Sequence, residues 1–145
     1  MTSWSTVEEQ APELAARVRG CFDVRKHCTM ATLRADGSPR ISGTEVQWED
    51  GDLWVGSITG ARKARDLQRD ARVAIHSPTV DAPEGREHEW AGEAKVAGRA
   101  VEVPHEGAHR FRIAPAEVVH TAVDGDALLI TSWHADRGVQ ERRRR

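Results

Sequence analysis

The chain has 145 residues, of which 30% are charged and 39% hydrophobic, and this composition is typical of one globular domain with a core that needs no disulfide bonds. The net charge of −2 gives no overall attraction to nucleic acid, so we expect no nucleic-acid partner. No apolar run is long enough to span a membrane and residues 1–5 lack the features of a signal peptide, so we expect no membrane contact and a cytoplasmic location.

The N-terminal segment, residues 1–25, is predicted to form an amphipathic helix. Ser5-x-x-Glu8 and Thr6-x-x-Glu9 both fit a capping box. Apolar residues then recur at helical spacing, at Leu14, Val18, Cys21 and Phe22. The two cysteines of the chain, Cys21 and Cys28, have no metal-binding or redox spacing, and we expect both to be buried thiols.

Three antiparallel strands are expected next, over residues 28–34, 41–48 and 53–57. The first two are joined by a hairpin turn whose Asp36-Gly37 pair supports positive φ angles. A tight turn over residues 49–52 leads into the third. A short basic helix and a strand over residues 72–76 follow.

The second half of the chain continues the β pattern. A loop from Pro78 to Trp90, rich in Pro, Gly and charge, is long enough to be functional. Residues 94–103 form a long strand in which Gly98 predicts a bend or bulge. Residues 116–123 and 127–133 form a final hairpin, and the basic tail, residues 138–145, is expected to be disordered.

The predicted elements amount to six or seven mostly antiparallel strands with short helices between them. This pattern favours a mainly β fold, a closed or nearly closed barrel that leaves few exposed strand edges. No internal repeat or change in composition divides the chain, so we expect one domain over residues 1–145.

The segment with most functional information is the small-residue stretch that ends the third strand, followed by Arg62 and Lys63. Glycine and serine allow a ligand to approach the backbone, and the start of a helix attracts anions. The segment therefore predicts a phosphate site. The alternative is a solvated basic helix whose arginines and aspartates form local ion pairs.

The order of strand, small residues, Arg-Lys, short helix and Asp70-x-Arg72-Val73 resembles the pyridoxamine 5′-phosphate oxidase-like split β-barrel family, whose members bind a flavin or deazaflavin. The resemblance extends from about Lys26 to Ile75 and more weakly to Trp133. It implies an FMN-binding-protein-like split β-barrel that forms a homodimer with the cofactor at the subunit interface.

The resemblance also implies roles for individual residues. Arg62 and Lys63 would bind the cofactor phosphate, and Gly56 and Ser57 would contact the cofactor. Further residues on an earlier strand would line its ring or ribityl region: Arg40, Ser42, Gly43 and Thr44. The implied cofactor is FMN, with the deazaflavin coenzyme F-420 as an alternative and haem a less favoured one.

The activity implied is that of an oxidoreductase, with hydride transfer between the cofactor and an unidentified small-molecule substrate. Pyridoxamine phosphate oxidases carry a Lys where this chain has Glu45, which argues against the namesake reaction. No catalytic acid or base stands out in the sequence. A non-catalytic flavin or haem carrier is the alternative, with His76 or His120 as a haem ligand, although hydrogen-bonded strand histidines are the simpler interpretation.

One further motif, His105-Glu106-Gly107-Ala108-His109, matches the zinc-protease pattern and would make the chain a zinc hydrolase. That chemistry requires both imidazoles on one firm helix, but Pro104 and Gly107 disfavour such a helix. We therefore expect the stretch to be structurally incidental and expect no metal site.

Overall fold

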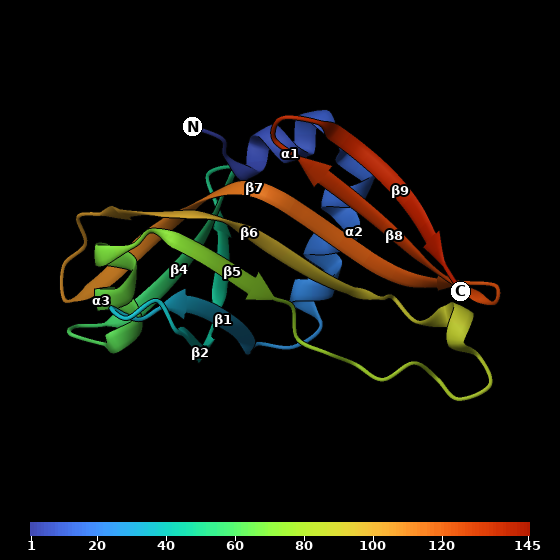
Figure 1. Ribbon diagram of the computed structural model, residues 1–145, viewed down its shortest axis with the longest axis horizontal. Coiled ribbons are helices and arrows are strands. Elements are labelled where there is room, and N and C mark those ends of the chain that lie inside the picture. Colours follow the sequence, from blue (N-terminus) through green and yellow to red (C-terminus); the bar gives the residue numbers. More distant parts are fainter.

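The computed structural model describes residues 1–145 and is built on one nine-stranded antiparallel sheet (Figure 1). The strands are β1 (Cys28–Leu33), β2 (Pro39–Thr44), β3 (Val46–Glu49), β4 (Asp52–Ile58), β5 (Arg72–His76), β6 (Glu93–Val103), β7 (Ala108–Asp124), β8 (Ala127–His134) and β9 (Gly138–Arg144). The helices are α1 (Trp4–Gln10), α2 (Pro12–Asp23), α3 (Arg62–Arg69) and the 3-10 helix η1 (Glu87–Glu89).

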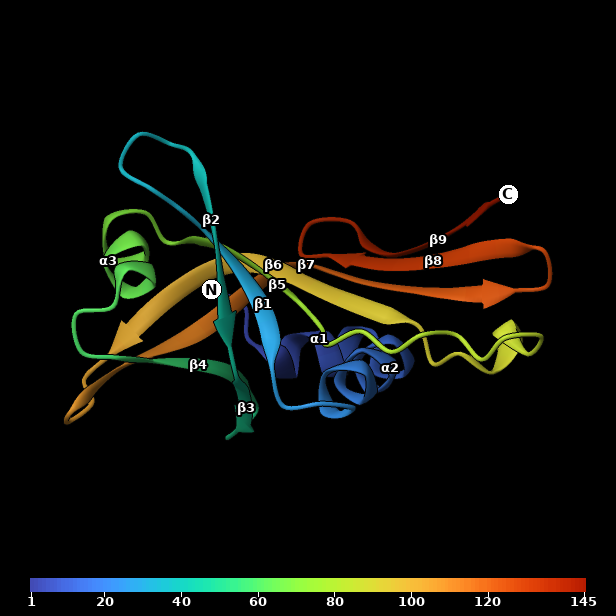
Figure 2. The same ribbon diagram turned by 90° about the horizontal axis from the view of Figure 1, so that it is seen from below.

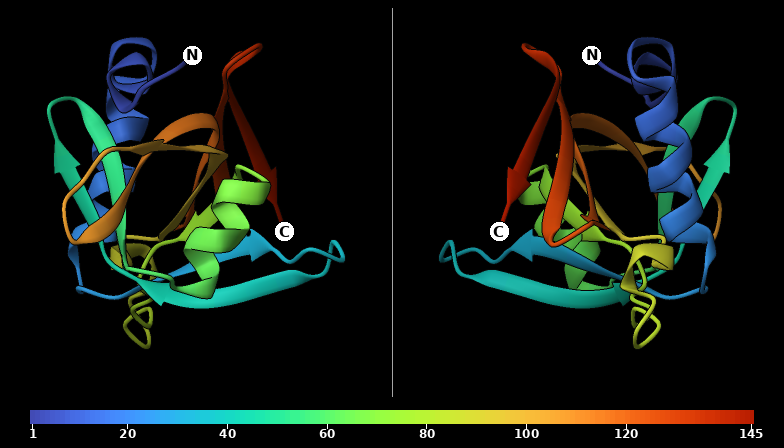
Figure 3. Two further views of the ribbon diagram at one scale, coloured as in Figure 1. Left: turned by 90° about the vertical axis from the view of Figure 1, so that its left-hand side faces the viewer. Right: turned by 90° about the vertical axis from the view of Figure 1, so that its right-hand side faces the viewer.

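The segment of residues 39–49, which contains β2 and β3, bends at Glu45 and brings the two ends of the sheet together. The strand order is β2-β1-β5-β6-β7-β4-β3, so β2 and β3 lie at opposite ends, yet only Glu45 separates them in the chain. The first part of the segment pairs with β1 and the second with β4. Figure 3 shows the strands curving around a common interior. The predicted mainly β, split-barrel fold is confirmed, but the sheet has nine strands instead of the predicted six or seven.

The long strand β7 connects the barrel to an extension of the sheet. Its first half pairs with β4 and its second half with β8, while β6 runs beside most of its length. The register shifts between Ala97 and Gly98, which confirms the predicted bulge. A Cβ atom at Gly98 would collide with the carbonyl oxygen of Ala114, so glycine is required there for close backbone approach.

The predicted disorder of the basic tail is wrong, because residues 138–144 form β9 and pair with residues 128–134 of β8. Ion pairs offset part of the positive charge, since Arg143 contacts Asp124 and Arg145 lies 3.8 Å from Asp126. Figure 2 shows the β8–β9 hairpin extending beyond the barrel.

Two further element boundaries differ from the prediction. The N-terminal helix is divided at Ala11, which has φ −146° and ψ 63°, and Pro12 begins the second helix. The capping box that starts α1 is formed by Ser3 and Thr6, three residues apart but earlier than expected. The predicted strand over 41–48 is divided at Glu45 into β2 and β3.

The core fills the barrel interior and the space beneath α1 and α2, which lie together on one side of the sheet (Figure 2). Its largest fully buried side chains include Trp4, Phe111 and Trp133. Both cysteines are free and buried, as predicted. None of the helices combines the length and the apolar character that crossing a membrane would need.

Candidate functional site

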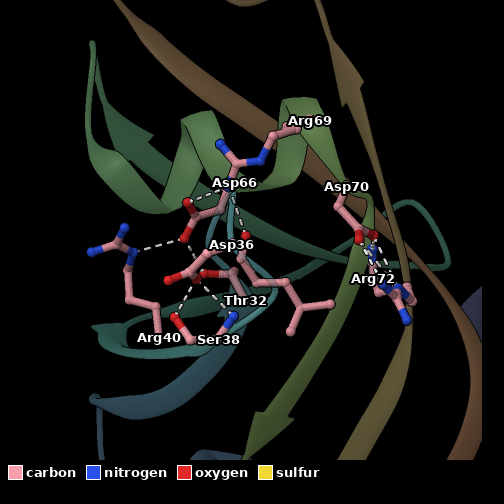
Figure 4. A network of polar contacts seen from close by, with 9 residues as sticks. Thr32, Asp36, Ser38, Arg40, Asp66, Arg69, Asp70 and Arg72 are labelled. Atoms are coloured by element: carbon pink, nitrogen blue, oxygen red, sulfur yellow. Dashed lines mark hydrogen bonds and ion pairs between the residues drawn. The ribbon is translucent and has the colours of Figure 1, made fainter.

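Helix α3 is fixed to the barrel through one buried carboxylate. The side chain of Asp66 is 3% exposed and accepts three hydrogen bonds, from Thr32 Oγ1 at 2.7 Å, Arg40 Nε at 2.7 Å and Arg69 Nη2 at 3.0 Å. Arg69 also donates to the carbonyl oxygen of Leu33 at 2.8 Å. Figure 4 shows these side chains converging from β1, β2 and α3. The network therefore fixes the helix against the two strands.

Two opposing effects act on this carboxyl group. Burial raises the pKa of Asp66. Hydrogen bonds from Arg40, Thr32 and Arg69 together lower the pKa by more than burial raises it, so the pKa lies below its ordinary value. Asp66 is therefore charged at neutral pH and binds two arginines. The basic surface of α3 thus includes the local ion pairs that the alternative interpretation expected, at its C-terminal half.

The N-terminal end of α3 has no comparable partner. Gly60 supplies the positive φ, +78°, that the turn from β4 needs. The N-cap residue Ala61 makes no side-chain hydrogen bond to the first-turn N–H groups. The next two residues are Arg62, which is exposed, and Lys63, whose ammonium group donates to the carbonyl oxygen of Gly43 at 2.8 Å. This end of the helix therefore offers positive charge without a built-in anion.

A cavity of about 890 Å³ opens at this point. The residues that line it come from the connection before β1, from β2 to β4, from the start of α3 and from the β6–β7 hairpin: His27, Gly43, Thr44, Glu45, Gln47, Glu49, Gly56, Ser57, Ile58, Ala61, Lys63, His105, Gly107, Ala108, His109 and Arg110. Its volume is within the range of pockets that hold cofactors and other small molecules.

The structure brings together five of the eight predicted cofactor-binding residues on the cavity wall, namely Gly43, Thr44, Gly56, Ser57 and Lys63. The other three do not line the cavity. Arg62 is exposed on α3, Ser42 is half-buried on β2, and Arg40 is bound to Asp66.

The cavity wall also carries charged side chains, of which Glu49 and Arg110 were not predicted from the sequence. Glu49 accepts a hydrogen bond from Arg110 at 2.7 Å, and the Arg110 guanidinium lies 3.8 Å from the centre of the Trp54 ring. Glu45 lies 3.4 Å from His27 Nε2. Arg110 on β7 pairs with Gly56 on β4, and this pairing brings Arg110 to the cavity. Alternation of charged and apolar residues from Arg110 onward is the sequence signal that could have indicated this strand.

The zinc-protease-like stretch lies on a hairpin instead of a helix. His105, Glu106 and Gly107 belong to the connection between β6 and β7, and His109 is the second residue of β7. No group of three or more His, Cys, Asp or Glu side chains is placed to hold a metal ion. The prediction that the whole stretch is structurally incidental is wrong for His109, because its ring makes two hydrogen bonds.

The two histidines considered as haem ligands have hydrogen-bond partners, as the simpler interpretation expected. His120 is buried and its Nε2 lies 2.8 Å from the carbonyl oxygen of Ala91. Burial lowers the pKa of His120, which favours its neutral form. His76 Nδ1 lies 2.8 Å from the carbonyl oxygen of Ser77.

Comparison with solved structures shows the same fold in other proteins. PhzG from Burkholderia lata 383, in complex with tetrahydrophenazine-1-carboxylic acid, matches 97% of this chain and 87% of its own at 13% identity, with a TM-score of 0.65. A pyridoxamine 5′-phosphate oxidase-related, FMN-binding protein from Nostoc punctiforme PCC 73102 matches 96% and 97% at 12% identity, with a TM-score of 0.63. A protein described as F420 Reductase matches 68% and 92% at 16% identity, with a TM-score of 0.52.

The sequence itself gives the family assignment. No match was found among curated proteins. The model of the family described as pyridoxamine 5′-phosphate oxidase, however, matches residues 14–138. This range contains the whole barrel, helix α3 and every residue of the cavity wall. The chain therefore belongs to the pyridoxamine 5′-phosphate oxidase family.

Proposed function

We propose that the cavity binds a phosphate-bearing flavin-type cofactor and that its phosphate lies at the start of α3. The observation that carries this proposal is the meeting of Lys63 and the N-terminal turn of α3 at the cavity wall. Charge-assisted hydrogen bonds from lysine, arginine and helix N–H groups are strong ligands for phosphate. The exposed Arg62 is the second cation at this position.

The cavity walls fit such a cofactor. A Cβ atom at Gly43 would have no neighbour within 4 Å, and at Gly56 the nearest atom would be 3.6 Å away, so both glycines leave room for a ligand next to the backbone. The hydroxyl group of Ser57 lies on the same wall and can rotate towards a bound group.

The activity we propose is hydride transfer to or from a small molecule, a chemistry that the cofactor supplies when bound. The chain would bind the phosphate through Lys63 and Arg62, hold the cofactor against β4, and shape the substrate side with β3. Glu45 places a carboxylate on that side where pyridoxamine phosphate oxidases carry a lysine, and this change disfavours a phosphorylated substrate such as pyridoxamine phosphate.

The choice of cofactor rests on the resemblance and on the relatives. FMN is our first candidate, supported by the FMN-binding relative from Nostoc punctiforme. The deazaflavin coenzyme is the second, supported by the fold shared with F420 Reductase.

We also propose that the chain acts as a homodimer with the cofactor at the subunit interface. Only three of the 16 residues lining the cavity are hydrophobic, whereas a flavin ring presents a large apolar face. Ile41 and Ile58 are 75% and 79% exposed, and Ile58 lies on the cavity wall. A second copy of the chain would supply the missing apolar contacts, in a symmetric pair.

The test is a fluorescence titration of the purified protein with FMN and with the deazaflavin coenzyme. Lys63→Ala and Arg62→Ala should each weaken binding by about 2 kcal/mol, or roughly thirtyfold, as expected for a charge-assisted hydrogen bond. The double variant should bind least well. Arg65→Ala, which removes the same charge from an exposed position three residues further along α3 than Arg62 and away from the helix start, should leave the affinity unchanged.

Riboflavin serves as the phosphate-free control. Its affinity should be low and indifferent to these changes, because it lacks the group that the two cations bind. If both single variants bind FMN and the deazaflavin coenzyme as tightly as the parent, the phosphate assignment is wrong. If the parent binds neither cofactor, the proposed function is wrong.

A further inference from the structure

The β6–β7 hairpin is fastened to the turn that leads from β4 into α3. The backbone N–H of Gly60 donates to His109 Nε2 at 3.1 Å, and Thr59 Oγ1 donates to the carbonyl oxygen of Gly107 at 3.3 Å. The partners of these two bonds lie 49 and 48 positions apart in the sequence, and pairing of Ser57 with His109 across β4 and β7 brings them together.

The imidazole of His109 is held in one tautomer and one orientation. Its Nδ1 lies 2.8 Å from Glu102 Oε2, and Glu102 Oε1 accepts a hydrogen bond from Gln68 Nε2 at 2.9 Å. Because Nε2 accepts the Gly60 N–H, the ring proton is on Nδ1 and is donated to the carboxylate. The ring also stacks on Phe111, and its side chain is only 15% exposed.

We propose that His109 is a positioning residue that holds the β4–α3 turn so that the start of α3 presents its cations to a phosphate in the cavity. The inference rests on the proposed function. It explains why a histidine lies on the cavity wall between a carboxylate and a glycine N–H.

The turn needs such a support because of its own conformation. Gly60 has the flexibility of glycine at positive φ, and the N-cap Ala61 contributes no side-chain hydrogen bond. The Asp66 network fixes only the far half of α3. If His109 offered no acceptor to Gly60, the turn that precedes Lys63 would have to be ordered when the ligand binds. That ordering would cost affinity.

Two substitutions separate hydrogen bonding from packing. His109→Phe keeps a flat ring against Phe111 but removes the acceptor for Gly60. His109→Gln places an amide oxygen near the position of Nε2 and an N–H₂ group towards Glu102, so it can restore both bonds. We expect His109→Phe to weaken FMN binding roughly tenfold with riboflavin affinity unchanged, and His109→Gln to stay near the parent.

A second measurement needs no ligand. Amide hydrogen exchange of Gly60, followed by NMR, should be faster in His109→Phe than in the parent and should return towards the parental rate in His109→Gln. A merely structural role of the ring would leave His109→Phe like the parent in both measurements, and that result would overturn the inference.

The two proposals fail in different ways. If the parent prefers FMN to riboflavin but His109→Phe keeps the same preference, the positioning role is wrong and the proposed function stands. If the parent shows no preference for the phosphate-bearing ligand, both proposals are overturned.

Discussion

Replacement of Asp66 by Asn should destabilise the fold more than any other change of a single charge in α3. The carboxylate is 3% exposed and accepts three hydrogen bonds, two of them from arginines. Asn keeps the shape but loses the charge, and its N–H₂ group faces one of the donors. Loss of one partner from a buried ion pair costs on the order of 3 kcal/mol, and for this chain length we expect a fall in melting temperature of roughly 10 °C.

The destabilisation caused by Asp66→Asn should be larger at neutral pH than in acid, because it depends on the charge of the Asp66 carboxylate. Because the pKa of Asp66 is lowered in the folded protein, its stabilising contribution is complete above the unfolded value of about 4 and is lost as pH falls through the folded pKa. The difference in free energy of unfolding between parent and Asp66→Asn should therefore be full at pH 7 and shrink below pH 4.

Urea unfolding followed by tryptophan fluorescence measures this difference at each pH. Asp70→Asn is the matched control, since Asp70 follows the same helix and binds Arg72 at 2.8 Å in an exposed pair. It should change stability very little. Equal effects of the two substitutions at pH 7, or a difference for Asp66→Asn that does not shrink in acid, would refute the account of the network.

Two further changes test the fold and the assembly. Gly98→Ala should destabilise the protein by about 1–3 kcal/mol, because the new Cβ would collide with Ala114. Gly20→Ala in α2 has open space around the new Cβ and should stabilise the protein by about 0.5–1 kcal/mol. Urea unfolding of both variants measures these opposite changes. Light scattering should report about twice the chain mass of 16.1 kDa if the proposed homodimer forms, and a monomer that still binds cofactor tightly would contradict it.

Local patterns in the sequence were sufficient to predict a mainly β barrel and the position of α3, and the family resemblance specified the split form of the barrel. Asp36-Gly37 and the turn before Asp52 defined the early hairpins, and Gly98 marked a bulge. The Arg62-Lys63 pair after Gly60 located the helix start. Each of these signals lies within a few residues of the feature it predicts.

Long-range pairing explains most of what the sequence did not predict. Residues 138–144 are mostly polar, so their charge suggested disorder, and only the partner strand β8 gives them a β conformation. His109 lies 49 residues from its partner Gly60. Its spacing from His105 suggested a zinc motif, so its position on a strand was not predicted. Arg40 was predicted to line the cofactor site together with its neighbours on the same strand. Its Nε instead donates to the carboxylate of Asp66, 26 positions later.

Helix α3 is held at its two ends by different chemistry, and this division separates stability from binding. At the C-terminal half, Asp66 joins the helix to β1 and β2 through a buried ionic network, which contributes to folding whether or not a ligand is present. At the N-terminal end, hydrogen bonds from Gly60 to His109 and from Thr59 to Gly107 hold a turn on the cavity wall. Asp66→Asn should therefore lower the melting temperature, whereas His109→Phe should lower the preference for a phosphate-bearing ligand with little loss of stability. Parallel losses in both properties for both variants would mean that the helix responds as one unit.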